Sequence, residues 1–108
     1  MLIDTHAHVN FNAYKDDSDE VIRRSLDNDV WMINVGSQYS TSRRAVEMAE
    51  KYEKGVYAAI GLHPVHLETG LVKIKNDAEE IQFPTIEESF DYEQYKKLTQ
   101  SPKVVAIG

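Results

Sequence analysis

The sequence contains no cysteine, which excludes disulfide bonds, thiol catalysis and thiolate metal sites. Histidine, aspartate and glutamate are therefore the side chains available for binding a metal. Long apolar runs are also absent: no stretch could span a bilayer, and Asp4 follows Met1 too soon for the apolar region of a signal peptide. We expect a cytoplasmic protein that does not interact with a membrane.

An excess of basic residues is absent as well. The 108 residues carry a net charge of −6, and the acidic excess lies in the segment from Glu68 to Glu93. Proteins that bind duplex DNA through its backbone present a basic surface, so tight non-specific binding of duplex DNA is not expected. A phosphodiester could still be engaged by metal ions in a pocket, because the overall charge does not forbid that contact.

A polar motif, Asp4-Thr5-His6-Ala7-His8, ends the first apolar segment. In an extended strand, side chains two residues apart project from the same face, so Asp4, His6 and His8 are predicted to point the same way. Two imidazoles that converge on one small volume can supply two ligands to a divalent metal. Asp4 could ligate the metal directly, but orienting one of the imidazoles is the interpretation we prefer.

Apolar segments of strand length alternate with helical patterns along the chain. Strands are predicted at Leu2–His8, Val30–Gly36, Val56–Leu62 and Lys103–Gly108. The first helix begins in the acidic cluster after Asp16 and ends near Asn28. The second is capped by Ser40, Thr41 or Ser42 and ends before Gly55. Short crossovers of this kind connect parallel strands, so the sequence predicts an α/β fold.

The segment between the third and fourth strands interrupts this alternation. Leu71–Lys75 and Glu80–Phe83 predict a short hairpin that Pro84 ends. This acidic insertion follows the third strand, so it is either a lid over the strand ends or a solvated surface excursion. A third helix is predicted near Asp91, and three apolar side chains share one of its faces: Tyr92, Tyr95 and Leu98.

A parallel βαβαβαβ run with short connections is typical of half of a TIM (β/α)₈ barrel, which is about 250 residues long in full. We therefore expect residues 1–108 to be the N-terminal half of a barrel, truncated after its fourth strand. Such a half leaves its first and last strands as open edges. If it folds alone it should expose apolar surface, and then associate with itself or with the missing C-terminal half.

Three motifs together resemble the TatD-like metal-dependent deoxyribonucleases of the amidohydrolase superfamily. They are Asp4-x-His6-x-His8, Gly61-Leu62-His63-Pro64 and Pro102-Lys103-Val104-Val105-Ala106-Ile107-Gly108. The resemblance covers the whole chain in outline, although the region from 66 to 90 is longer than expected for the family. It implies a TIM barrel with one or two divalent metal ions at the carboxyl ends of the strands, which hydrolyses phosphodiester bonds in DNA.

The resemblance also implies roles for individual residues. His6 and His8 match the first two metal ligands of the family, and His63 matches a histidine that contacts substrate phosphate. A bridging glutamate follows Gly108 in the family, and the remaining ligands and the catalytic base belong to the missing half. The catalytic residues are therefore not assigned in this chain, which is expected to be inactive alone.

Two other functions remain open at this stage. An amidohydrolase that cleaves C–N or carboxylic ester bonds would keep the same fold and the same motifs. A non-catalytic half-barrel that associates with a partner or with itself is the second. The sequence does not distinguish Mg, Zn and Mn as the metal.

Overall fold

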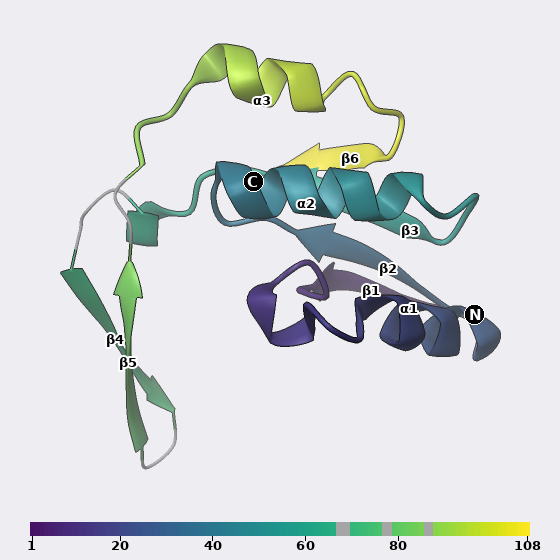
Figure 1. Ribbon diagram of the computed structural model, residues 1–108, viewed down its shortest axis with the longest axis horizontal. Coiled ribbons are helices and arrows are strands. Elements are labelled where there is room, and N and C mark those ends of the chain that lie inside the picture. The colour runs from purple at the N-terminus through teal and green to yellow at the C-terminus, as the bar shows by residue number, and fades with distance from the viewer. Residues whose placement is uncertain (67–69, 77–78, 86–87) are drawn as a thin grey trace.

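The computed structural model describes residues 1–66, 70–76, 79–85 and 88–108, with side chains described for residues 1–66 and 88–108. Four parallel strands form one sheet in the order β1-β2-β3-β6 (Figure 1). These strands are β1 (Leu2–Ala7), β2 (Val30–Val35), β3 (Val56–Ile60) and β6 (Val104–Ile107). The order of the strands in the sheet is therefore the order in which they follow one another along the chain. The structure confirms the predicted α/β half of a TIM barrel.

Helices connect the sheet strands and pack against one of the two faces of the sheet (Figure 1). They are α1 (Ser18–Asp27), α2 (Tyr39–Glu50) and α3 (Tyr92–Leu98), with short 3₁₀ helices η1 (Asn12–Tyr14) and η2 (Pro64–His66). Crossovers between neighbouring parallel strands are right-handed, which puts successive helices on one side of a sheet whose order follows the chain. No helix among the described residues combines the length and the apolar character needed to cross a bilayer.

The core between the helices and the sheet consists of two apolar clusters. In the first, Ile22 of α1 is fully buried with Met32 of β2 and Ala49 of α2. In the second, Ala58 of β3 packs with Tyr95 of α3 and with residues of α2. Val21 and Leu26 of α1 pack against the same cluster, so Ile22 lies on the apolar face of this helix. These clusters fix α1 and α2 over the sheet and so hold the loops that follow β1 and β2.

The start of α2 differs from the prediction. Gln38 is the residue that precedes the helix, so Ser40, Thr41 and Ser42 all lie within it and none is the N-cap. The Thr41 hydroxyl accepts hydrogen bonds from the backbone amides of Ser37 and Gln38, at 2.9 and 3.1 Å. A hydroxyl at the third helical position can satisfy amides before the helix in the way a capping box does, which moves the start of the helix toward the N-terminus.

The predicted hairpin is present, with β4 (Gly70–Asn76) antiparallel to β5 (Glu79–Thr85). Pro84 does not end it, because Pro84 lies within β5 opposite Leu71. A proline is tolerated in an edge strand when its missing N–H faces away from the partner. Figure 1 shows the hairpin on the side of the sheet toward which the strands point, extending away from the sheet, and both the lid and the surface excursion stay predictions.

Glu88, in the acidic segment after the hairpin, connects α2 with α3. Its Oε2 accepts hydrogen bonds from the Tyr39 amide at 2.9 Å and from the Tyr95 hydroxyl at 3.0 Å. Burial, together with the hydrogen bond to Glu88, raises the pKa of Tyr95. Tyr92 and Tyr95 line the same surface hollow, as expected for side chains on one helical face, but Tyr92 is 63% exposed while Tyr95 is buried. Part of the acidic excess thus stabilises a helix N-terminus, where negative charge is favourable.

Tyr52 and Asp19 join the end of α2 to α1 through a short hydrogen bond that the tyrosine hydroxyl donates. Burial and this hydrogen bond raise the pKa of Tyr52 from 10.0 to about 12. The same bond, together with the neighbouring Arg23, lowers the pKa of Asp19 below 3.8. The pair therefore contributes its full stabilisation between about pH 4 and pH 10, and loses it on both sides of that range.

The Tyr52→Phe variant is expected to melt a few degrees below the parent chain at pH 7, because the hydroxyl donor is lost. In the parent, the contribution of Tyr52 falls as the pH rises through about 12, since the folded state holds the proton more tightly than the unfolded chain. The difference between the two proteins should therefore shrink between pH 10 and pH 12. Thermal unfolding followed by circular dichroism at pH 7, 10 and 11.5 measures it, and a constant difference would contradict this origin.

Candidate metal centre

The two histidines of the N-terminal motif lie together at the carboxyl end of β1. Their ring centroids are 4.9 Å apart, with the planes close to perpendicular at 87°. His6 is exposed and His8 is half-buried. The structure thus brings together the two imidazoles that the sequence nominates as metal ligands.

The backbone reaches this arrangement through an irregularity that the sequence does not reveal. Asp4 pairs with Met32 and Ala7 pairs with Asn34, so three steps along β1 match two steps along β2. A register shift of this kind interrupts the regular pairing of the two strands between Asp4 and Ala7. The Asp4 carboxylate accepts a hydrogen bond from the backbone amide of His6 at 3.0 Å. Asp4 therefore orders the backbone at His6, and a role toward an imidazole stays a prediction.

A hydrogen bond to β2 determines the tautomer of His8. Its Nδ1 lies 3.0 Å from the carbonyl oxygen of Val35. A carbonyl oxygen only accepts, so Nδ1 carries the proton. In the neutral imidazole, Nε2 then presents its lone pair, and a histidine that donates its other N–H to a backbone carbonyl is the usual form of a metal ligand. The Phe11 ring lies beside that of His8, with centroids 4.3 Å apart, and holds it from one side.

Two buried asparagines, which the sequence analysis does not single out, support this carbonyl and its loop. Asn10 donates from Nδ2 to Val35 O at 3.2 Å and to Thr41 O at 2.9 Å. Asn34, on β2, accepts at Oδ1 from the amide of Val9 at 2.9 Å. Both side chains are fully buried. The signal for Asn34 was available, because an amide within the apolar run of β2 needs a buried partner.

The Asn10→Ala variant is expected to lose about 1–3 kcal/mol of stability, because the buried carbonyls of Val35 and Thr41 each lose a donor. The Asn12→Ala variant is the matched control: Asn12 is exposed, and an exposed substitution of this type is expected to stay within about 0.5 kcal/mol. Urea unfolding of the three proteins measures the difference. Equal stabilities of the two variants would mean that Asn10 does not connect the β1 loop to α2.

His63 lies at the end of β3, at the same edge of the sheet as the histidine pair. Its backbone amide donates to Ser37 O at 2.7 Å, and its Nδ1 accepts from the amide of Val65 at 3.0 Å. Since Nδ1 accepts, the proton of the neutral ring is on Nε2, and His63 is an exposed residue that can offer this N–H as a donor. A donor suits an anionic oxygen, whereas a metal ligand needs a lone pair. His66 instead has its Nε2 within 3.3 Å of the Ser37 hydroxyl.

The histidine pair fits part of a metal site. Catalytic zinc sites take three protein ligands and an open position, and imidazole is a usual ligand in them. His6 and His8 supply two such groups, and the tautomer of His8 suits ligation. Among the described residues, no cluster of three or more His, Cys, Asp or Glu side chains could hold a metal ion. The described residues therefore offer two candidate ligands, His6 and His8, and not a complete set.

These features define a class of protein: a TIM barrel with a pair of histidines at the carboxyl end of its first strand, where barrel enzymes have their active sites. The comparison with known families gives the particular membership. The chain belongs to the family described as TatD related DNase, whose sequence model matches residues 3–108. The resemblance found from the three motifs is thereby confirmed.

Three curated relatives are all named as uncharacterized metal-dependent hydrolases. The chain is 41% identical over 109 aligned residues to the uncharacterized metal-dependent hydrolase YabD of Bacillus subtilis, covering all of this chain and 36% of that protein. It is 34% identical to the uncharacterized metal-dependent hydrolase MJ1582 of Methanocaldococcus jannaschii, over 57% of this chain and 24% of the relative. YjjV of Escherichia coli, named in the same way, is 36% identical over 62% of this chain and 26% of its own length. The chain thus spans between a quarter and about a third of these relatives.

Proposed function

We propose that this chain is the N-terminal part of a metal-dependent hydrolase that cleaves phosphodiester bonds in DNA. The observation that carries the proposal is the hydrogen bond from His8 Nδ1 to Val35 O, which prepares Nε2 to ligate a metal. Membership of a family described as TatD related DNase supports DNA as the substrate. The names of the three relatives support a hydrolase that needs a metal.

In this proposal each described residue has a separate task. His6 and His8 would hold a divalent ion through Nε2 of His8 and a ring nitrogen of His6. Such an ion would supply hydroxide near neutral pH and stabilise negative charge on the phosphate. His63 donates its Nε2–H to a phosphate oxygen and so orients the scissile group. The other metal ligands and the proton-transfer groups come from residues outside this chain, so the chain alone is inactive.

The test is an activity assay on the full-length protein with Mg, Mn or Zn and with EDTA. Fluorescently labelled oligodeoxynucleotides, single-stranded and duplex, should be cut in the presence of metal and remain intact in EDTA. Ester and amide substrates assayed in parallel address the amidohydrolase alternative. Turnover of those substrates without cleavage of DNA would overturn the proposal.

The open edges of the sheet concern the assembly of the complete barrel. Among the described strands, β1 and β6 each have one neighbour in the sheet, and apolar side chains on both are exposed: Leu2 is 71% exposed and Ile107 is 73% exposed. These exposed side chains support the expectation that the half-barrel exposes apolar surface. We propose that further strands of a closed barrel cover these edges, since the relatives are longer than this chain.

Residues 1–108 expressed alone are therefore expected to self-associate, because the exposed apolar edges have no other partner. Sedimentation velocity measures this directly, with the full-length protein as the control for a covered sheet. A monodisperse monomer across the micromolar range would contradict the expectation. Added C-terminal half should compete with self-association and return a 1:1 complex.

A further inference from the structure

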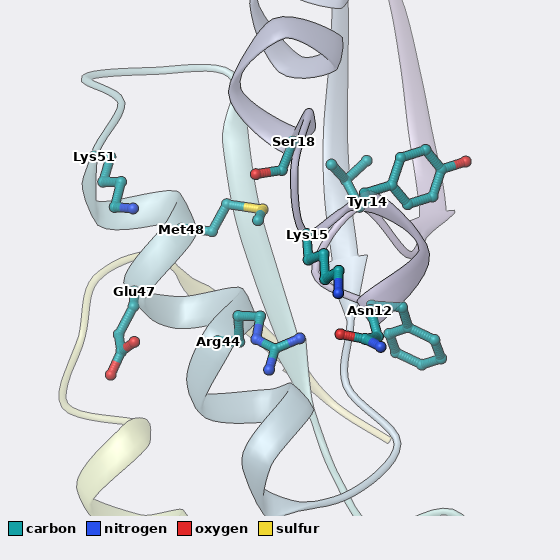
Figure 2. Close-up of a pocket in the computed structure, with 10 residues that line it drawn as sticks. Asn12, Tyr14, Lys15, Ser18, Arg44, Glu47, Met48 and Lys51 are labelled. Atoms are coloured by element: carbon teal, nitrogen blue, oxygen red, sulfur yellow. The ribbon is translucent and has the colours of Figure 1, made fainter.

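A surface pocket of about 200 Å³ lies between α2 and the segment that joins β1 to α1 (Figure 2). Three cationic side chains line it: Lys15 from the loop after η1, Arg44 from the middle of α2 and Lys51, the C-cap residue of α2. Phe11 and Tyr14 contribute aromatic rings to the same lining. The pocket therefore joins positive charge with aromatic surface in a protein whose net charge is negative.

The charged residues that line the pocket are three cations and one acid. Glu47 is the acid among the lining residues, and it pairs with Arg43 at 3.4 Å. Within the part of the chain that has described side chains, neither Lys15 nor Lys51 forms an ion pair with a carboxylate. Arg44 is held in place because its Nη1 donates to the carbonyl oxygen of Asn10 at 3.1 Å. An anion that entered the pocket would meet three cations and one carboxylate that is already paired.

The pocket adjoins the histidine pair. Phe11 lines the pocket, and its ring lies beside that of His8 with centroids 4.3 Å apart. Asn10, whose carbonyl holds Arg44, donates from its side chain to the same Val35 oxygen that accepts from His8. One short segment, from His8 to Lys15, therefore contributes residues both to the metal centre and to the pocket. A nucleic acid strand bound at His8 could continue across Phe11 toward the cations.

We propose that this pocket binds a phosphate of the nucleic acid strand, next to the phosphate that is cleaved at the histidine pair. The assignment rests on the proposed function for the identity of the strand. Lys15, Arg44 and Lys51 neutralise the phosphate oxygens, and Phe11 and Tyr14 offer surfaces on which a base stacks. Local cations of this kind hold a strand in register even though the protein as a whole is acidic.

The experiment measures binding without cleavage. A fluorescein-labelled octathymidylate is titrated with the full-length protein in EDTA, and its fluorescence anisotropy is recorded from 50 to 200 mM salt. The Lys15→Gln and Lys51→Gln variants should each weaken binding about threefold. Each should also make the negative slope of log K against log salt shallower by about 0.7, because one contact between a lysine and a phosphate is lost. Lys54→Gln is the matched control, because it removes the same charge from an exposed turn that does not line the pocket.

Three results would overturn the proposal. In the first, the Lys15→Gln and Lys51→Gln variants bind the oligonucleotide as tightly as the Lys54→Gln protein does. In the second, the concentration of inorganic phosphate that displaces the oligonucleotide is the same for the parent protein and for the Lys15→Gln and Lys51→Gln variants. A third arm separates a small-anion site from a strand site: binding of inorganic phosphate that depends on Lys15 and Lys51, with no binding of the oligonucleotide, rejects the strand. Failure of the proposed function gives a different result from failure of this proposal. If only the proposed function is wrong, the full-length protein shows no metal-dependent cleavage of DNA, but its binding of the oligonucleotide in EDTA still depends on the two lysines.

Discussion

Replacing His8 with alanine in the full-length protein is expected to abolish metal-dependent cleavage of DNA. The hydrogen bond from its Nδ1 to Val35 O leaves the lone pair of Nε2 available for the metal ligation proposed above. Loss of a group that only orients a ligand costs about 10- to 100-fold in metal affinity or activity. Loss of the ligand itself should exceed that range, because the ion that generates the nucleophile is no longer held.

The control for this substitution is His66→Ala. His66 lies at the same edge of the sheet, but its Nε2 is directed at the Ser37 hydroxyl and it is outside the predicted ligand set. Its replacement should change the rate less than tenfold. Metal content measured by inductively coupled plasma mass spectrometry should fall in His8→Ala and stay constant in His66→Ala. Equal metal content and equal activity in both variants would remove His8 from the site.

Replacing Gly36 with alanine is expected to destabilise the protein by about 3 kcal/mol or more, at the upper end of the cost of overpacking. A Cβ at this position would lie 2.3 Å from the Ser42 hydroxyl oxygen and 2.5 Å from the Ser42 Cα. The second contact is with backbone, so a change of side-chain rotamer cannot relieve it. Ser42 is itself fixed, because its hydroxyl donates to Gly61 O and accepts from Gly61 N. The close approach is therefore built into the junction of β2, α2 and β3.

Urea unfolding measures this effect, with Ser40→Ala as the control on an exposed position of the same helix. The double variant Gly36→Ala with Ser42→Ala discriminates between the two contacts. It removes the hydroxyl and leaves the Cα clash, so stability should not return to the level of Ser42→Ala alone. Full recovery in the double variant would show that the hydroxyl, and not the backbone, is what excludes a side chain at Gly36.

The sheet and its helices could be predicted from the sequence because their signals are local. Apolar runs such as Val30–Val35 and the helical face that contains Ile22 report burial through their periodicity alone. Gly55, which has a φ of +89°, was expected after the second helix for the same local reason. The pairing of β1, β2, β3 and β6 then follows from the rule that short right-handed crossovers connect neighbouring parallel strands.

The contacts that form the site could not be predicted in this way, because they join segments far apart in the chain. The bond between His8 and Val35 spans 27 residues, and the bond between Glu88 and Tyr39 spans 49. The register of β1 against β2 also shifts between Asp4 and Ala7, which the alternation of residues along the strand does not predict. Periodicity reports which face of an element is buried, but it does not report which partner satisfies a particular polar atom.

The most direct test of the account is the position of a bound metal ion in the full-length protein. Crystals soaked in zinc, or grown with it, are measured at the zinc absorption edge, and an anomalous difference map locates the ion. The account predicts a peak about 2.0–2.1 Å from Nε2 of His8 and equally close to a ring nitrogen of His6. A peak held by other residues, with the two imidazoles away from it, would contradict the account.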